Sequence, residues 1–317
     1  MSRSAAPTLA ALAAICFWSM TPVFVTIIGD RLNSGEIFVL AAIAGGAVSL
    51  VVALIDGPLR RTIFSAAVRR FMVPAAISGA FLGLWYYGFY RALQETGKVE
   101  ATVVAFTWPM IALIALPLLS RRPLRLGAVR WSLIVLGLAG AGIAAFSPES
   151  SIVGGSGLIW AGLAALGSGL YLPFAVRAAE RMPSDLGPVR STFASISVAN
   201  VSALVCVLLF RLVAGDPVDV GEALGSAGGV GLAMCAAIGI GVYLVAEVGW
   251  TWAMQTELAP RIGAIPYLSP VLSTVLLAAI FGSPVTPYAV VGLVLVVGAN
   301  IALWIAGRAP RSSPDAH

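Results

Sequence analysis

Glu247 is the acidic residue that the sequence places deepest in an apolar segment. It belongs to a series at intervals of four, Tyr243, Glu247, Thr251 and Gln255, which puts these side chains on one face of a helix. A carboxylate inside a membrane is costly and usually functional. It can bind an ammonium group or take up a proton. A structural hydrogen bond, or an ion pair with an arginine near a helix end, is the alternative interpretation.

A second series, Gly79, Gly83, Tyr86, Tyr90 and Gln94, occupies one face of another apolar segment. Two glycines four residues apart allow close helix packing. The tyrosines and the glutamine offer aromatic faces for an apolar group and polar atoms for its ends. The series therefore predicts either a cavity wall or a packing face.

Further aromatic and hydroxyl residues stand at related positions in other segments. The full set of candidate binding residues is Trp18, Thr21, Tyr86, Tyr90, Gln94, Trp108, Tyr171, Glu247, Thr251, Tyr267 and Ser269. Pro22, Pro109 and Pro270 lie inside apolar segments, where a proline removes a backbone hydrogen bond and bends a helix. We expect these prolines to kink gating helices, although static curvature is also consistent with proline in membranes.

The residue inventory argues against catalysis and against a metal or cofactor site. His317 is the only histidine and lies in a polar tail. No phosphate-binding G-x-x-x-x-G-K-[ST] loop is present. Cys16, Cys206 and Cys235 fall in apolar segments, which predicts buried thiols without a disulfide framework. We expect no enzyme, no cofactor and no metal. Glu100 and Glu257 lie near segment ends, where we expect them to be solvated.

These residues sit on apolar runs of about 20 residues, the length that a membrane-spanning helix needs. The chain is 59% hydrophobic and 10% charged, against about 25% charged residues in soluble domains. Barrel strands would be shorter and would alternate. The sequence predicts an all-α integral membrane protein with ten transmembrane helices and a first segment that is retained. The ten segments are roughly 8–28, 36–55, 71–93, 98–119, 126–146, 156–175, 190–213, 229–254, 260–281 and 286–306.

Basic residues orient these segments. With the N-terminus inside, 15 of the 19 Lys and Arg residues fall in inside segments, and only Arg31, Arg91, Lys98 and Arg211 fall outside. Positively charged loops stay cytoplasmic, so both termini are predicted in the cytoplasm. The net charge of +5 therefore needs no nucleic-acid partner.

The second half of the chain repeats part of the first at a shift of 161 residues, in constant register over about 65 residues. The matched pairs are Gly88–Gly249, Ala92–Ala253, Gln94–Gln255, Pro109–Pro270, Pro123–Pro284 and Gly137–Gly298. Each half, 1–150 and 151–307, holds five segments, so the halves must have opposite orientations; a polar cytoplasmic tail follows at 308–317. The arginines after the fourth segment have no basic counterparts after the ninth, as inversion requires. Inverted repeats with a midplane site are typical of secondary transporters.

Two motifs resemble those of a known family. Phe17-Trp18-Ser19-Met20-Thr21-Pro22, and Ala92-Leu93-Gln94 before a segment with a central proline, resemble the drug/metabolite transporter superfamily with two EamA repeats. The chain is most similar to the YddG-type exporters of aromatic amino acids in bacterial inner membranes. The resemblance implies export of Phe, Tyr, Trp and other neutral amino acids. One departure is the absence of a Glu that many EamA repeats carry before Pro123 and Pro284.

We therefore predict a secondary transporter that exports neutral, preferably aromatic, amino acids across a bacterial inner membrane by alternating access. Its partners are a small-molecule substrate and the lipid bilayer, and a monomer is compatible with this prediction. A broad drug or metabolite exporter is the alternative. The lack of midplane Arg or Lys disfavours phosphorylated substrates, and a membrane-embedded enzyme or a receptor fits less well.

Overall fold

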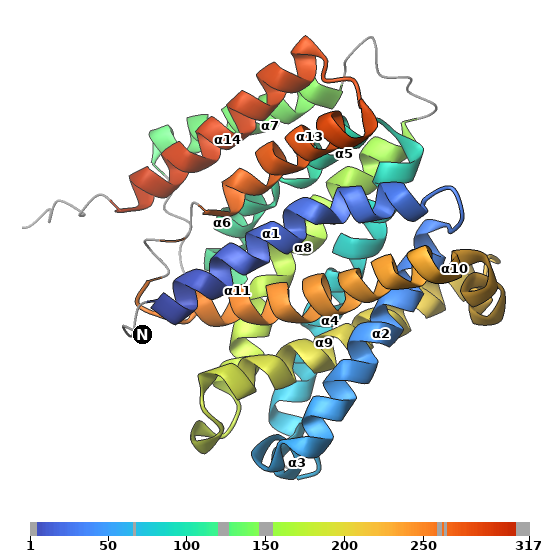
Figure 1. Ribbon diagram of the computed structural model, residues 1–317. Coiled ribbons are helices and arrows are strands. Elements are labelled where there is room, and N and C mark those ends of the chain that lie inside the picture. Colours follow the sequence, from blue (N-terminus) through green and yellow to red (C-terminus); the bar gives the residue numbers. More distant parts are fainter. Residues whose placement is uncertain are drawn as a thin grey trace, which may run out of the picture.

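The computed structural model describes residues 5–65, 68–119, 127–145, 155–258, 262 and 265–308, which form helices and no strand (Figure 1). The helices of the first half are α1 (Ala5–Ile28), α2 (Ser34–Ile55), α3 (Gly57–Ile63), α4 (Val68–Glu95), α5 (Lys98–Ala105), α6 (Trp108–Leu119) and α7 (Ala128–Ala145). The α-helices of the second half are α8 (Ser156–Glu180), α9 (Pro188–Val213), α10 (Val220–Ala236), α11 (Glu247–Met254), α13 (Leu268–Phe281) and α14 (Pro287–Arg308). The π-helix η2 (Ala237–Ala246) and the 3-10 helices η1 (Ser184–Leu186) and η3 (Ile265–Tyr267) complete the set.

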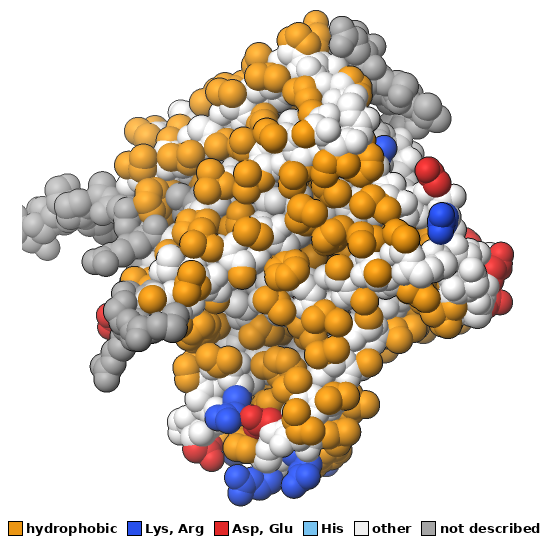
Figure 2. Space-filling view, in the orientation of Figure 1, with side chains coloured by type: hydrophobic (Ala, Val, Ile, Leu, Met, Phe, Trp, Pro, Cys, Tyr) orange, Lys and Arg blue, Asp and Glu red, His pale blue; other side chains and the backbone are white. Residues whose placement is uncertain are grey.

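The chain is a multi-pass membrane protein by helix length and composition. Eight helical stretches in the described residues are long and apolar enough to cross a membrane, and Ala128–Ala144 and Ile265–Phe281 are shorter apolar helices. Hydrophobic side chains cover the face seen in Figure 2, as lipid contact requires. All-helical architecture is thus confirmed. The crossing of the membrane by all ten segments, and the inversion of the halves, stay predictions.

Helices from both halves build the central core. α4 lies against α8 and α9, and α1 lies against η2, α11 and α13. α7 and α14 pair with each other at one edge (Figure 1). Of the three cysteines only Cys235 is buried, while Cys16 is exposed on α1, so the expectation of buried thiols was wrong for Cys16.

The regular α-helix is interrupted just before Pro109 and Pro270, so the irregularity predicted at these prolines precedes each of them. A turn at 106–107 separates α5 from α6, so Pro109 is the second residue of α6. Pro270 is the third residue of α13, directly after η3. A proline in the first turn of a helix costs no hydrogen bond, because its missing N–H would have no partner there. Pro22 does lie inside α1.

The segment before Glu247 is a ten-residue π-helix, which no periodicity in the sequence indicated. The backbone N–H of Glu247 donates to the carbonyl of Val242, five residues earlier. Close packing surrounds this segment: a Cβ atom on Gly239 would lie 2.0 Å from the carbonyl oxygen of Ala41 in α2. π-Helices are rare, and the short ones that interrupt α-helices frequently lie at functional sites.

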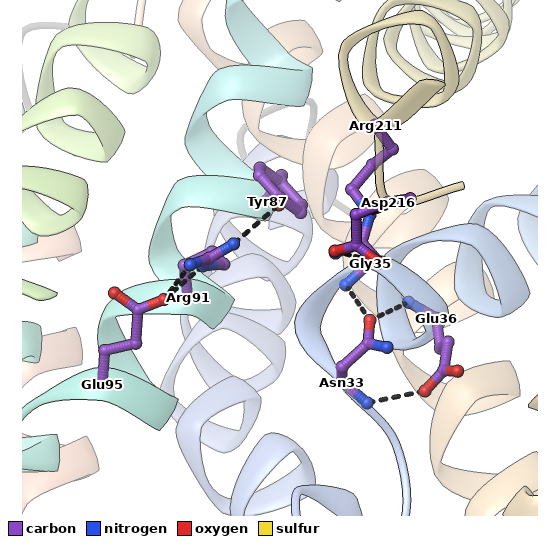
Figure 3. A network of polar contacts seen from close by, with 8 residues as sticks. All are labelled: Asn33, Gly35, Glu36, Tyr87, Arg91, Glu95, Arg211 and Asp216. Atoms are coloured by element: carbon purple, nitrogen blue, oxygen red, sulfur yellow. Dashed lines mark hydrogen bonds and ion pairs between the residues drawn. The ribbon is translucent and has the colours of Figure 1, made fainter. Parts of the chain in front are cut away.

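Polar contacts fix the helix ends that meet near Asn33 (Figure 3). Asn33 caps α2 by accepting from the N–H groups of Gly35 and Glu36, and the Glu36 carboxylate accepts from the Asn33 N–H at 2.7 Å. Arg211, only 3% exposed, pairs with Asp216 at 2.9 Å and packs over Gly35. These contacts tie the end of α9 to the start of α2.

Candidate functional site

Glu247 is the first residue of α11 and is 1% exposed. Its Oε1 accepts hydrogen bonds from the Tyr86 hydroxyl at 2.5 Å and from Trp18 Nε1 at 3.3 Å. Its Oε2 accepts one from the Tyr171 hydroxyl at 2.6 Å. These four residues, which we call the carboxylate cluster, come from α11, α4, α1 and α8. The structure therefore brings together four of the predicted site residues from distant parts of the sequence.

The partners of Glu247 are all neutral. Ion pairs among the described residues involve Arg91, Arg190 and Arg211, none of them with Glu247. The ion-pair interpretation of Glu247 is thus wrong for this part of the chain. Among the described residues, the polar contacts of Glu247 come only from hydroxyl and indole donors, so no positive side chain there offsets the burial of its carboxylate. A proton or a bound cation would offset it.

Aromatic side chains enclose the cluster. A small cavity beside Glu247 has a volume of about 10 Å³, the space of about one water molecule. It is lined by Trp18, Trp85, Phe106, Trp108, Ser168, Tyr171 and Glu247. The Trp18 and Trp250 rings meet edge to face, with centroids 5.7 Å apart. The cluster is closed in this conformation, since a ligand of amino-acid size needs a far larger space.

Tyr90 forms a second polar pair beside the cluster. Its hydroxyl lies 3.1 Å from that of Tyr243, and the Tyr243 ring stacks on Tyr86 with centroids 4.1 Å apart. The Asn200 side chain donates to the backbone carbonyl of Tyr243 at 2.8 Å. The aromatic half of the α4 series therefore faces η2 and α11. Its glycine half packs on α9, because a Cβ on Gly79 would lie 2.2 Å from the Ala199 carbonyl oxygen.

Four other predicted site residues have different surroundings. Thr21 donates to the carbonyl of Phe17 in its own helix at 3.0 Å. Ser269 accepts from the Ser19 hydroxyl at 3.1 Å, which joins α13 to α1. Thr251 is fully buried one turn after Glu247, and Tyr267 is half-buried at the end of η3.

Gln94 lies away from Glu247, at a larger cavity of about 670 Å³. Its side chain donates to the Leu32 carbonyl at 2.9 Å. This cavity lies where α1 and α4 end and α5 begins, with Asp30, Lys98 and Glu100 in its wall. Glu100 is only 5% exposed, so the expectation that it is solvated was wrong. Glu100 is the third residue of α5, and its carboxylate folds back against Gly97 at the start of the helix.

The sequence analysis missed Trp85, Phe106, Trp250 and Asn200. Trp250 lies three residues after Glu247, so the helical spacing that selected Thr251 also indicates Trp250. Trp85 is adjacent to Tyr86, and Phe106 lies in the turn between α5 and α6. No sequence signal separated these two rings from ordinary packing residues.

Comparison of the sequence with models of protein families identifies its family. The EamA-like transporter family matches twice, at residues 6–146 and 155–305. The chain belongs to the EamA-like transporter family. The two matches confirm two EamA repeats in this EamA-family transporter, and with them its place in the drug/metabolite transporter superfamily.

Structural comparison agrees on the fold. A solved structure described only as the crystal structure of a protein matches this EamA-family chain with a TM-score of 0.61 and 25% identity. The match covers 98% of this chain and 100% of the other. No curated protein matches the sequence.

Proposed function

We propose that this EamA-family transporter exports neutral amino acids, preferably aromatic ones, across the inner membrane of a bacterium, with the carboxylate cluster as its central binding site. The observation that carries the proposal is the buried Glu247 carboxylate, held by neutral donors and enclosed by aromatic rings. Such a site offers one anionic group and a large apolar surface.

Glu247 binds the substrate ammonium group in this proposal. An ammonium donates three hydrogen bonds and supplies the positive charge that the cluster lacks. Tyr86 and Tyr171 hold the two carboxylate oxygens in place, each hydroxyl donating to a different oxygen. The Trp18 and Trp108 rings beside it add cation–π attraction for an ammonium group.

The start of α6 receives the substrate carboxylate. α6 has 12 residues and begins at Trp108, which lines the same cavity as Glu247. The start of a helix carries partial positive charge. Pro109 has no N–H and the Met110 N–H donates to the Thr107 carbonyl, so the Trp108 N–H is the donor that we assign to the substrate carboxylate. Interrupted membrane helices use such ends to bind carboxylates. The side chain of the substrate then lies among Trp18, Trp85 and Phe106.

Opening the cluster requires movement of the surrounding helices. The breaks before α6 and α13 let each of these helices tilt separately from the residues that precede it. Pro109 and Pro270 fix the starts of the two helices, and Pro22 lies in α1 close to the cluster. We assign these three prolines to the gating elements of an alternating-access cycle.

A broad exporter of lipophilic amines is the second candidate function. The buried Glu247 carboxylate with its aromatic neighbours favours this candidate as well. These groups suffice to bind an organic cation that has no carboxylate of its own. The two functions differ in what they require of the ligand. An amino-acid exporter needs both charged groups of the substrate, whereas an amine exporter needs only one.

Uptake by proteoliposomes tests the proposal. The labelled ligands are L-phenylalanine, L-alanine, phenethylamine and hydrocinnamate, with and without a proton gradient. The proposal expects uptake of phenylalanine above alanine, and little uptake of the analogues that lack either charged group. Phenethylamine transported faster than phenylalanine would favour the amine exporter. Absence of uptake for every amino acid tested would refute the proposal.

A further inference from the structure

Seven arginines gather where α2, α3, α4, α8 and α9 meet. Residues 56–70 and 177–190 hold seven Arg against Asp56, Glu180 and Asp185, so their net charge is 7 − 3 = +4. Blue side chains lie at the lower end of the molecule in Figure 2, where Figure 1 places α3. We call this region the arginine end; its basic residues are Arg60, Arg61, Arg69, Arg70, Arg177, Arg181 and Arg190.

A small buried hydrophobic cluster holds these segments together. Leu59 of α3, Phe71 of α4 and Met182 after α8 belong to one small buried cluster. On the surface, Arg190 pairs with Asp56 at 2.8 Å, and an Arg181 Nη1 donates to the Arg70 carbonyl at 3.4 Å. The arginines therefore share one face as a consequence of tertiary packing.

Most of this positive charge has no ion-pair partner among the residues that the structure describes. Arg190 is the only one of the seven in an ion pair with a residue that the structure describes. Arg60, Arg61, Arg69 and Arg177 are exposed. Like charges held close together repel one another, so an anionic partner is favourable here.

Exposed apolar side chains border the arginines. Ile55, the last residue of α2, is 77% exposed, and Phe64, directly after α3, is 74% exposed. Leu59 points inward with 2% exposure, while Arg60 and Arg61 beside it point outward. Arginines next to exposed apolar residues at the end of a membrane helix are the composition of a segment that lies in the lipid headgroup region.

We propose that the arginine end is a binding site for anionic phospholipids. Guanidinium groups of Arg60 and Arg61 bind the phosphodiester oxygens, because their planar donors match phosphate geometry. Ile55 and Phe64 lie against the acyl chains of the same lipid. A free phosphate ion uses the arginines alone, so the apolar contacts distinguish the two sources of phosphate. The proposal is independent of the transported substrate.

Lipid binding to the purified full-length chain in neutral detergent tests this site. Short-chain phosphatidylglycerol and phosphatidylcholine are titrated separately, and bound lipid is counted by native mass spectrometry. We expect the wild type to prefer phosphatidylglycerol. Each arginine contributes about fivefold, so Arg60→Gln with Arg61→Gln should weaken phosphatidylglycerol binding about 30-fold. The matched control is Arg31→Gln with Lys98→Gln, away from the arginine end, which should bind as the wild type does.

Two further comparisons separate charge from folding. Arg60→Lys with Arg61→Lys should retain most phosphatidylglycerol binding, and added salt should weaken that binding in the wild type while leaving phosphatidylcholine unaffected. Phe64→Ser should weaken lipid binding without changing binding of inorganic phosphate. Equal binding of both lipids, full binding of phosphatidylglycerol by the Gln pair, or unchanged lipid binding by Phe64→Ser would overturn the proposal.

Discussion

The Tyr86 hydroxyl donates a 2.5 Å hydrogen bond to Glu247, and the two residues are 161 positions apart, the same interval that relates the two halves of the sequence. In the predicted register they are equivalent residues of the two repeats, and they are in direct contact. Under two-fold symmetry, a residue touches its own equivalent only close to the axis. The contact supports a pseudo-two-fold axis through the carboxylate cluster, which is where an inverted-repeat transporter places its substrate.

Aromatic neighbours should set substrate preference. Trp108→Ala removes a ring from the cavity beside Glu247, and Tyr90→Ala removes the partner of Tyr243. Loss of one aromatic contact costs about 0.5–1.5 kcal/mol beyond buried area, or about 2- to 13-fold in affinity. Transport of phenylalanine by each variant should fall more than transport of alanine in the same proteoliposomes. Parallel losses for both substrates would point to a packing role instead.

Close contact between α2 and η2 should make Gly239 intolerant of substitution. Gly239→Ala places a methyl group 2.0 Å from the Ala41 carbonyl oxygen. Overpacking of this kind costs about 1–3 kcal/mol. We expect a lower thermal unfolding midpoint in detergent. Gly298→Ala is the matched control, because its added Cβ meets open space within a helix. Equal midpoints for the two variants would show that η2 can shift away from α2.

The sequence indicated the apolar segments, because continuous hydrophobic runs need no tertiary context. It also predicted that Trp18, Tyr86, Tyr171 and Glu247 belong to the site. It predicted bends at Pro109 and Pro270 but not that α6 and α13 begin beside these prolines, since the sequence pattern around a proline is the same within a kinked helix and at the start of a new one. The sequence did not indicate the π-helix before Glu247. This segment packs against α1 and α2, and such tertiary contacts leave no periodic pattern in the sequence.

Gln94 shows a different limit of sequence reasoning. It shares a helix face with Tyr86, but it lies eight residues further along, about 12 Å at 1.5 Å per residue. Helical periodicity shows which helix face carries a residue, but it does not show how far along the helix a cavity extends. Gln94 therefore lines a different cavity from the one beside Glu247.

Asp56 should make stability depend on acidic pH. The Leu59 N–H and the Arg190 guanidinium hold the pKa of Asp56 below its usual value. Its stabilising contribution is present above the unfolded-state pKa of about 3.9 and is lost as the pH falls through the lower folded-state pKa. Asp56→Asn keeps a capping oxygen. The variant should be less stable than the wild type at neutral pH, and the difference should shrink below about pH 4.

Thermal unfolding of both proteins in detergent across this pH range provides the measurement. Asp219→Asn is the control, because Asp219 caps α10 through the Glu222 N–H without an ion pair to a described residue. A stability difference for Asp56→Asn that stays constant to the lowest pH would contradict the assignment.

Both termini should face the cytoplasm. The bias of basic residues, 15 against 4, predicts this orientation. A reporter that works only in the cytoplasm should be active when fused after Gly307, and one that works only in the periplasm should be inactive there. The reverse pattern would exclude an even number of crossings with the N-terminus inside.

The most direct test of the account is L-phenylalanine counterflow in proteoliposomes containing wild-type protein or Glu247→Gln. The substitution keeps the shape of the side chain and removes its charge. Loss of a hydrogen bond to a charged group costs about 1.5–3 kcal/mol, or about 10- to 150-fold in affinity. We predict that the concentration for half-maximal counterflow rises by a factor in this range, with an unchanged unfolding midpoint. A stably folded Glu247→Gln protein that exchanges phenylalanine at wild-type concentrations and rates would contradict the central role of Glu247.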